Sequence, residues 1–209
     1  MKKLVVALAV VFLLAVGIRI AHVNINAERP KTVVYEQGVE VEFGNNFYES
    51  SAESRDGYSI KVLSSRIVKT DDFLKENNID KLSIPTDIDD PFIKYVPEYV
   101  VDVEVLLKNT SNNKENGGID LYYLSLAADD FKLQVNDNIW DALYPQLNAS
   151  KRFKLRENTE ETIHFPFAIS YGDAEVTKAV SSDMLFVNDY QLILSKYPMD
   201  MRVNIVIDK

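Results

Sequence analysis

The chain has 209 residues, of which 46% are hydrophobic and 26% are charged, a composition typical of a folded globular protein. Lys2, Lys3 and Arg19 lie in or beside an apolar N-terminal run. After residue 19 the chain contains the other 20 basic residues and 32 acidic ones, which gives this part a net charge of −12. Such a field repels phosphate backbones and anionic lipid, so no nucleic acid partner is expected. The absence of cysteine excludes disulfides, thiolate catalysis and thiolate zinc sites.

The N-terminal residues carry an export signal. An unbroken apolar run over residues 4–18 follows Lys2 and Lys3, a charge layout that directs the rest of the chain outward. We therefore predict that residues 1–23 are a signal anchor or a signal peptide. Fifteen helical residues span only about 22 Å of a roughly 30 Å hydrocarbon core, so a single-pass anchor through residues 4–23 requires Arg19 to snorkel outward. The alternative is cleavage near Gly17 and secretion.

The rest of the chain is expected to be a tether over residues 24–34 and one β-rich domain over residues 35–209. Apolar residues alternate with polar ones in several short runs, as in strands with one buried face. These runs cover residues 39–43, 58–68, 99–107, 119–127, 131–135, 153–155, 162–171, 190–194 and 202–207. One short helix is expected over residues 70–77, because Asp71 and Asp72 suit a helix N-terminus.

Two strand predictions are specific enough to test. The strand at 99–107 places its valines on one face, and the Asn- and Gly-rich segment 109–118 should turn it into a hairpin with the strand at 119–127. In the strand at 162–171, Ile163, Phe165 and Phe167 share a face that His164 opposes. We expect His164 to point to solvent, and Pro166 to mark an edge strand or a bulge.

Eight or nine such strands with almost no helix favour an all-β fold. We predict an antiparallel immunoglobulin-like β-sandwich, preceded by the N-terminal apolar helix and containing the single short helix.

Several short patterns carry a family resemblance. They lie at residues 57–62, 71–74, 103–109, 165–167 and 194–198. Together they resemble uncharacterised Gram-positive exported proteins with a telokin-like, immunoglobulin-like sandwich, over roughly residues 35–207. The resemblance implies a membrane-attached extracytoplasmic domain. It carries over no catalytic residue.

Catalytic and metal-binding motifs are not found in the sequence. His22 and His164 are the only histidines, and one surface imidazole cannot form a triad or a zinc site alone. Acidic pairs such as Asp71-Asp72 and Asp129-Asp130 lack the spacing of a calcium loop. We therefore expect no enzyme activity, no metal and no cofactor. The rival hypothesis is a ligand-binding protein or enzyme with a carboxylate site on the loop from Pro85 to Pro97.

Aromatic residues are the best candidates for a contact surface, since 11 tyrosines, 10 phenylalanines and one tryptophan are present. Tyrosine and tryptophan provide the amphipathic anchors that protein interfaces favour. Tyr122, Tyr123 and Tyr197 are candidates, and we favour a partner contact at Tyr95, Tyr99, Trp140 and Tyr144. A basic stripe at Lys151, Arg152, Lys154 and Arg156 is interpreted as a solvated strand face. The predicted function is a noncatalytic interaction module outside the membrane, bound to an envelope protein and accessory to an envelope assembly or transporter.

Overall fold

The computed structural model describes residues 12–22, 30–49, 54–80, 96–112, 118–147, 150–169, 182–186 and 189–208. The chain divides into two compact units, Met1–Pro30 and Lys31–Lys209. The first contains a helix over residues 12–22 whose apolar side chains are exposed. Among the described residues, none of the helices combines the length and the apolar character that crossing a membrane requires.

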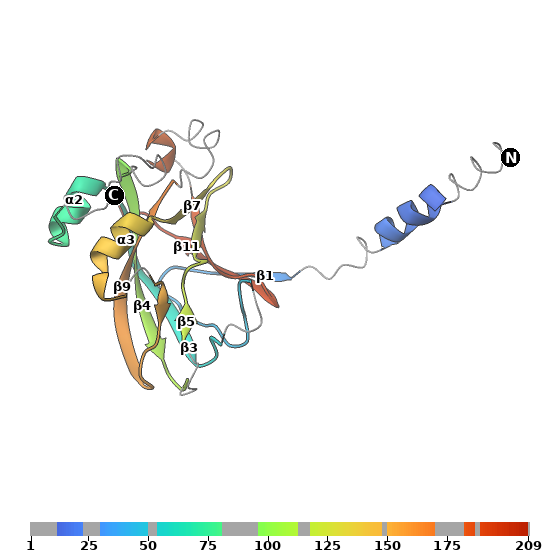
Figure 1. Ribbon diagram of the computed structural model, residues 1–209, viewed down its shortest axis with the longest axis horizontal. Helices are drawn as coiled ribbons and strands as arrows, with labels where there is room; N and C mark the ends of the chain where they lie inside the picture. Colours follow the sequence, from blue (N-terminus) through green and yellow to red (C-terminus); the bar gives the residue numbers. More distant parts are fainter. Residues whose placement is uncertain are drawn as a thin grey trace. The chain divides into compact units, whose positions relative to one another are not determined.

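The second unit is built on one nine-stranded sheet (Figure 1). Its strands, in the order in which they lie side by side, are β1 (Lys31–Tyr35), β11 (Met199–Ile205), β10 (Tyr190–Ser195), β6 (Ser125–Ala127), β7 (Lys132–Val135), β9 (Thr159–Ala168), β4 (Tyr99–Asn109), β3 (Tyr58–Lys69) and β2 (Glu40–Glu42). Strand β1 is parallel to β11, and the other neighbours are antiparallel. A small second sheet pairs β5 (Ile119–Asp120) with β8 (Arg152–Phe153).

The long sheet curls until it nearly closes into a barrel-like shape. The residues just after β1 and β11 meet the middle of β3 at a seam. There the Val206 amide donates to Gln37 Oε1 at 2.9 Å, and the Ser65 hydroxyl donates to the Val206 carbonyl at 2.7 Å. The Asp208 amide also donates to the Ser65 carbonyl at 2.8 Å. A curled sheet leaves fewer open strand edges than a flat one.

The core lies inside this curled sheet and follows the alternation of the sequence. In β4, Val101, Val103, Val105 and Leu107 are all buried, and in β9 Ile163, Phe165 and Phe167 are buried opposite them. Val103 is paired with Phe165 and Val101 with Phe167. The predicted phase of the strand at 162–171 is thus confirmed. Phe165 also stacks on Trp140, with ring centroids 5.2 Å apart.

Two short helices lie on the outside of the sheet. Helix α2 (Thr70–Glu76) occurs where the sequence predicts it, with Asp71 and Asp72 in its first turn. Helix α3 (Asp137–Leu143) begins after Asn136, whose side chain accepts a hydrogen bond from the Ile139 amide at 3.1 Å. Phe73 and Leu74 of α2 pack with Val100 of β4 and Ile139 of α3 in a second apolar cluster. Strand β4 is therefore buried on both faces at this end. The short 3-10 helices η2 (Pro145–Leu147) and η3 (Ser182–Phe186) complete the described elements.

The β-rich class is confirmed, but the two-sheet antiparallel sandwich is not what the structure shows. A single sheet nearly closes on itself instead, and it is mixed because the first strand pairs in parallel with the last. Strand β1 begins at Lys31, inside the segment 24–34 that the sequence predicts as a tether. Helix α3 was not predicted.

The predicted hairpin of residues 99–107 with 119–127 is wrong. Strand β4 pairs with β3 on one side and β9 on the other. Residues 119–127 form two separate strands, β5 and β6, that belong to different sheets. The Tyr122 amide donates to Asp120 Oδ1 at 2.9 Å, which turns the chain between them.

Pro166 lies in an interior strand, since β9 has neighbours on both sides. It lies just outside the β7 pairing, which covers only Phe167 and Ala168 of β9. The Asn136 amide donates to the Pro166 carbonyl at 2.9 Å. A proline is tolerated here because no ladder bond from β7 needs its missing N–H.

Candidate functional site

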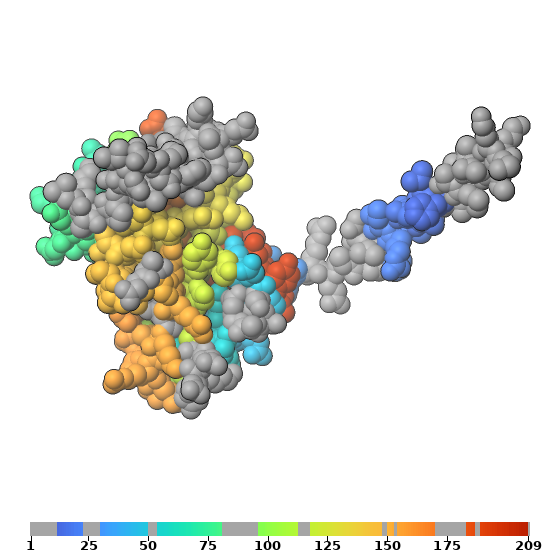
Figure 2. All heavy atoms as spheres, viewed as in Figure 1, coloured from blue at the N-terminus to red at the C-terminus, as the bar shows by residue number. Residues whose placement is uncertain are grey.

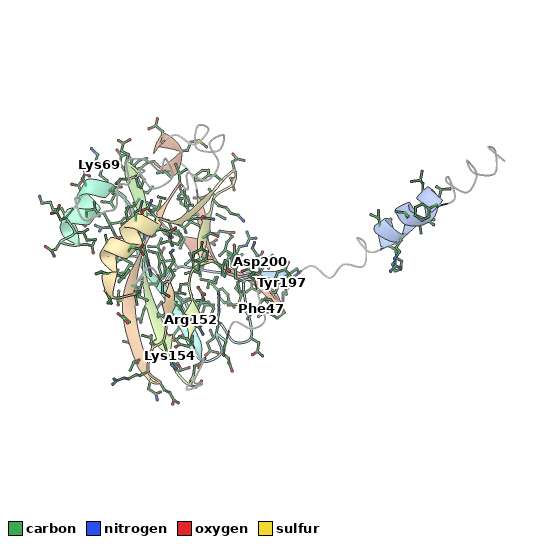
Figure 3. The ribbon with its side chains drawn as sticks, in the orientation of Figure 1. Phe47, Lys69, Arg152, Lys154, Tyr197 and Asp200 are labelled. Atoms are coloured by element: carbon green, nitrogen blue, oxygen red, sulfur yellow. The ribbon has the colours of Figure 1, made fainter. Side chains whose placement is uncertain are left out.

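Five aromatic residues from three separate segments form a group that we call the aromatic cluster: Phe47, Tyr48, Tyr122, Tyr123 and Tyr197. Tyr48 stacks on Tyr123 with centroids 5.4 Å apart and planes at 10°. Tyr122 meets Tyr123 edge to face at 5.2 Å, and Phe47 stacks on Tyr197 at 5.8 Å. Figure 3 shows Phe47 and Tyr197 together beside Asp200. Tyr122 is 60% exposed and Tyr197 is 48% exposed, so the cluster is a surface feature.

Backbone hydrogen bonds join two of these segments, the one at Phe47 and the one at Tyr197. The Phe47 amide donates to the Tyr197 carbonyl at 2.7 Å, and the Lys196 amide donates back to the Phe47 carbonyl at 2.9 Å. The Tyr197–Pro198 peptide bond is cis. In Figure 2 the yellow-green residues around 120, the cyan residues around 55–60 and red residues near the C-terminus adjoin on one face.

The buried side chain of Arg55 supports the aromatic cluster. Its side chain is almost fully buried, with one guanidinium nitrogen donating to the Leu194 carbonyl at 2.8 Å and the other to the Asp120 carbonyl at 3.0 Å. The guanidinium carbon lies 5.4 Å from the centre of the Phe43 ring. One side chain thus fixes the end of β10, which leads to Tyr197, and the end of β5, which leads to Tyr122.

Two lysines pack on the tyrosine rings of the cluster. Lys151 Nζ lies 4.8 Å from the centre of the Tyr122 ring, and Lys196 Nζ lies 4.6 Å from that of Tyr48. Both distances are typical of cation–π contacts. Lys151 is buried and its ammonium also donates to Asp137 Oδ1 at the start of α3. Lys151 is therefore not part of a solvated stripe as the sequence suggests, whereas Arg152 and Lys154 are exposed (Figure 3).

A cavity of about 260 Å³ adjoins the cluster. Its floor is the outer face of β6 and β7, where Ser125 lies opposite Gln134. Its wall contains Tyr48, Tyr122, Tyr123, Lys132, Asp137 and Lys151. The cavity is thus lined by three of the aromatic rings together with hydrogen-bonding and charged side chains.

Three of the favoured contact residues, Tyr99, Trp140 and Tyr144, are not members of the aromatic cluster, and the role of all four stays a prediction. Tyr95 lies outside the described residues. Tyr99 is half-buried and meets Phe186 edge to face at 5.4 Å. Trp140 has no exposed surface, and its ring packs between Tyr144 and Phe165. The Tyr144 hydroxyl accepts from the His164 amide at 2.7 Å, and burial raises the pKa of this phenol to about 12.

His164 points outward as predicted but is not a simple surface residue. Its Nδ1 lies 3.0 Å from an oxygen of Asp102, which is 3% exposed, and its Nε2 lies 3.9 Å from Glu104. Arg66 Nε holds the other oxygen of Asp102 at 3.3 Å, and Arg66 also pairs with Glu76 at 2.6 Å. The hydrogen bond that His164 makes to the Asp102 carboxylate raises the pKa of His164. The network depends on the register of β4 and β9, which places Asp102 opposite Pro166 and Glu104 opposite His164.

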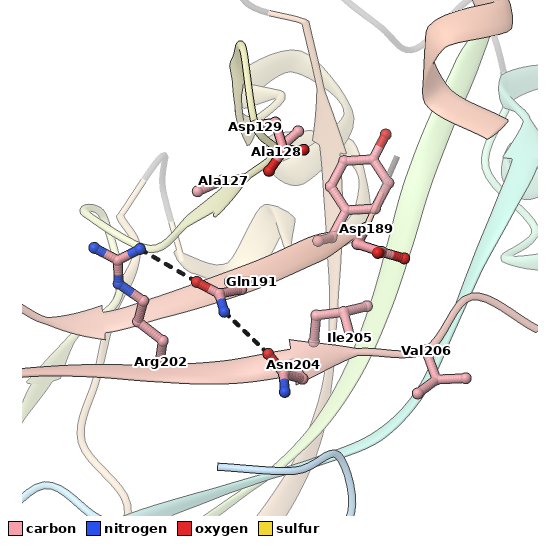
Figure 4. Close-up of a pocket in the computed structure, with 10 residues that line it drawn as sticks. Ala127, Ala128, Asp129, Asp189, Gln191, Arg202, Asn204, Ile205 and Val206 are labelled. Carbon is pink, nitrogen blue, oxygen red and sulfur yellow. Dashed lines mark hydrogen bonds between the residues drawn. The ribbon is translucent and has the colours of Figure 1, made fainter. Parts of the chain in front are cut away.

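A second, larger cavity of about 610 Å³ lies over β10 and β11 (Figure 4). Arg202 donates to Gln191 at 3.2 Å, and Gln191 donates to Asn204 at 3.0 Å. Asp200 holds the Arg202 guanidinium through two bonds of 2.9 and 2.7 Å, which balances its charge. Asp129 and Asp189 add two carboxylates to the wall. Hydrogen-bonding and charged side chains thus make up much of this wall, and Tyr190 is the single aromatic residue among the described residues that line it.

Metal sites of the usual kind are not formed by the part of the chain described above, which contains no group of three or more histidine or carboxylate ligands. The loop from Pro85 to Pro97, where the rival hypothesis places a carboxylate site, lies mostly outside the described residues. Phe47, Tyr48, Arg55 and Lys196 were missed by sequence reasoning, because they reach the cluster from distant segments.

A family described as a domain of unknown function (DUF5028) matches residues 32–201. That span runs from β1 into β11, so the chain belongs to this family. No curated protein and no solved structure matches the chain. The family description assigns no activity, and a function must therefore be inferred from the geometry.

Proposed function

We propose that this family member is a noncatalytic interaction module that lies outside a membrane and contacts an envelope protein through the aromatic cluster. The observation that carries the proposal is the joining of five aromatic rings from three segments at the surface, with two lysines packed on them. We therefore place the contact surface at Tyr122, Tyr197 and their neighbours, and not at the residues that the sequence favours.

Physical reasons support a contact role for such a cluster. Tyrosines supply large contact area at a low cost in side-chain entropy, and they are enriched among the residues that dominate binding energy. The rings are already fixed against one another and by Arg55, so little ordering remains to be done on binding. Lys196 adds local positive charge on an acidic body, which can orient a partner, whereas the charge of Lys151 is balanced by Asp137.

The location is proposed from the sequence. Residues 4–23 would hold the chain as a single-pass anchor with the body outside, and cleavage near Gly17 with secretion is the alternative. The resemblance to exported Gram-positive proteins with a telokin-like domain supports the same location. Tethering raises the effective concentration of a nearby partner, so even a weak contact can suffice. An accessory subunit of an envelope assembly or transporter fits this arrangement.

The polar cavity favours a second candidate function, a protein that binds a small polar ligand. Asp129, Asp189 and the Arg202–Gln191–Asn204 series are the groups that would recognise it. The same alternative also includes an enzyme with a carboxylate site.

The experiment is crosslinking on intact cells with a photoreactive residue placed near Tyr122. We expect a specific envelope protein to be recovered, and Tyr122→Ala in the same background to reduce the recovery at least fivefold. The matched control is Phe186→Ala, which removes another exposed aromatic, 55% accessible, that lies outside the cluster. Equal recovery from the two variants would contradict the proposal, and capture of a small molecule that is chemically converted would favour the enzyme.

A further inference from the structure

One side of the aromatic cluster lies where the chain enters the domain from the N-terminal segment. Lys31, the first residue of β1, is paired with Met199, which follows Tyr197 by two residues. The Met199 amide donates to Asn46 Oδ1 at 3.2 Å, next to Phe47. Neighbouring strands lie about 5 Å apart and each residue adds about 3.3 Å, so Phe47 and Tyr197 lie on the order of 10 Å from Lys31. Figures 1 and 3 show β1, Phe47 and Tyr197 at the same end of the domain.

The length of the connecting segment limits how far this end can lie from a membrane. Seven residues, 24–30, separate the proposed anchor from Lys31. A segment of that length spans at most about 25 Å when it is fully extended. With residues 4–23 retained as an anchor, the end that contains Phe47 and Tyr197 is therefore the one that the chain holds nearest to the bilayer.

The side chains at this end are of the kinds found at membrane–water interfaces. Tyr197 is exposed and stacks on the half-buried Phe47, and Pro198 is exposed in the same turn. Lys196 places its ammonium over the Tyr48 ring. Tyrosine is enriched at headgroup level because its ring is apolar and its hydroxyl is wet, and a lysine stem lies along apolar surface while its ammonium stays in water.

The charge at this end differs from that of the rest of the domain. Lys31, Lys196 and Glu49 lie here, and the carboxylate of Asp200 is paired with Arg202 at 2.7 Å. The end is thus slightly positive, whereas the chain after residue 19 has a net charge of −12. An anionic leaflet repels the acidic remainder and attracts lysines, so the field turns this end toward the headgroups.

We propose that the surface formed by Phe47, Tyr197 and the turn at Pro198 rests on the lipid headgroups of the membrane that holds the anchor. The short connection keeps the local concentration of lipid high, so weak contacts from a few side chains are enough. The inference rests on the proposed location and goes beyond the proposed function. It assigns the chain-entry side of the cluster to lipid and leaves the Tyr122 side to the protein partner.

The test uses the full-length protein in lipid vesicles with a single fluorescent label. The chain has no cysteine, so Asn45→Cys, at an exposed position two residues before Phe47, accepts one label. The matched control is Lys69→Cys, an exposed position that Figure 3 shows on the opposite side of the domain from Tyr197. The vesicles are phosphatidylcholine with phosphatidylglycerol and contain a headgroup quencher. We expect quenching about threefold stronger at residue 45 than at residue 69, because interfacial side chains are held at headgroup depth.

Two substitutions in the Asn45→Cys background distinguish docking from simple tethering. Tyr197→Ser removes the exposed ring and should at least halve the quenching, whereas Phe186→Ser removes an exposed aromatic outside the cluster and should leave it unchanged. Lys31→Glu keeps the rings and changes an exposed residue at the start of β1. It should weaken quenching on vesicles with phosphatidylglycerol and not on pure phosphatidylcholine. This second variant keeps the test decisive if Tyr197→Ser does not fold.

The outcomes separate this inference from the proposed function. Equal quenching at residues 45 and 69, or quenching that neither Tyr197→Ser nor Lys31→Glu changes, means that the chain connection alone brings the domain to the bilayer, and overturns the inference. Absence of docking on vesicles, with crosslinking on cells still dependent on Tyr122, overturns it and leaves the proposed function standing. Docking on vesicles without any Tyr122-dependent partner on cells supports the inference and contradicts the proposed function.

Discussion

The hydrogen bond between His164 and Asp102 makes stability depend on pH. Asp102 raises the pKa of His164 in the folded state above its unfolded value of about 6.5. A group with a raised folded pKa contributes stability that is fully present below the unfolded pKa and is lost as pH rises through the folded pKa. Glu104 strengthens the effect and Arg66 opposes it, since both lie close to the imidazole.

We therefore expect the free energy of unfolding of the native protein to fall, relative to that of His164→Gln, as pH is raised from about 6 upward. Urea unfolding at several pH values measures this difference. Glutamine keeps a hydrogen-bonding side chain but does not titrate, which makes it the matched control. A constant difference across the range would mean that His164 has the same pKa in both states.

The buried guanidinium of Arg55 should contribute to both stability and site geometry. Hydrogen bonds to charged groups contribute about 1.5 to 3 kcal/mol each, and Arg55 donates two to carbonyls. We expect Arg55→Met to lower the free energy of unfolding by about 3 kcal/mol, because the two carbonyls lose their donor. The exposed Arg152→Met is the control and should stay within about 0.5 kcal/mol. Equal losses in denaturant unfolding would rule out this role of Arg55.

Single residues were predictable where a local pattern determines their position. The alternation around His164 gave the correct face for Phe165 and Phe167, whose side chains are buried in the core. It could not show that Asp102 would contact His164 on the opposite face, because that depends on the register of two strands far apart in sequence. The aromatic cluster was hidden for the same reason, since Phe47, Tyr122 and Tyr197 come from three separate segments.

At the level of elements, helix α2 and the long strands could be predicted, and the strand partners could not. Alternation reports that a strand has one buried face, but it contains no information about which strand lies beside it. Strand β4 therefore looked like half of a local hairpin, whereas its second partner β9 arrives much later in the chain. The turn at Tyr122 had a local signal in Asp120, an acceptor two residues earlier.

The contact of α3 with β9 gives a prediction at this scale. Phe165 is fully buried, and its ring stacks on those of Trp140 and Phe167. Phe165→Ala should lower the free energy of unfolding by about 3 to 5 kcal/mol through lost burial and a cavity. The exposed Phe186→Ala should cost far less. Urea unfolding tests this, and a loss below 1 kcal/mol for Phe165→Ala would mean that α3 does not pack on the core.

For the whole molecule we expect stability that does not depend on calcium. The described residues contain no group of three carboxylate or histidine ligands, and the acidic pairs lack calcium-loop spacing. Exchange of millimolar calcium for EDTA should barely move the melting temperature. A site occupied at one hundred times its dissociation constant would add about 2.7 kcal/mol, so a shift of several degrees would contradict this prediction.

The pairing of β1 with β11 links the order of synthesis to the closing of the fold. Strand β1 leaves the ribosome near the start of the chain and β11 near its end, yet Lys31 pairs with Met199 and Tyr35 with Val203. Until β11 has emerged, β1 has no partner and its edge stays open to other strands. A chain that stops before Met199 therefore lacks both the partner of β1 and the Val206 amide that bonds to Gln37, so the barrel cannot close until β11 has been made.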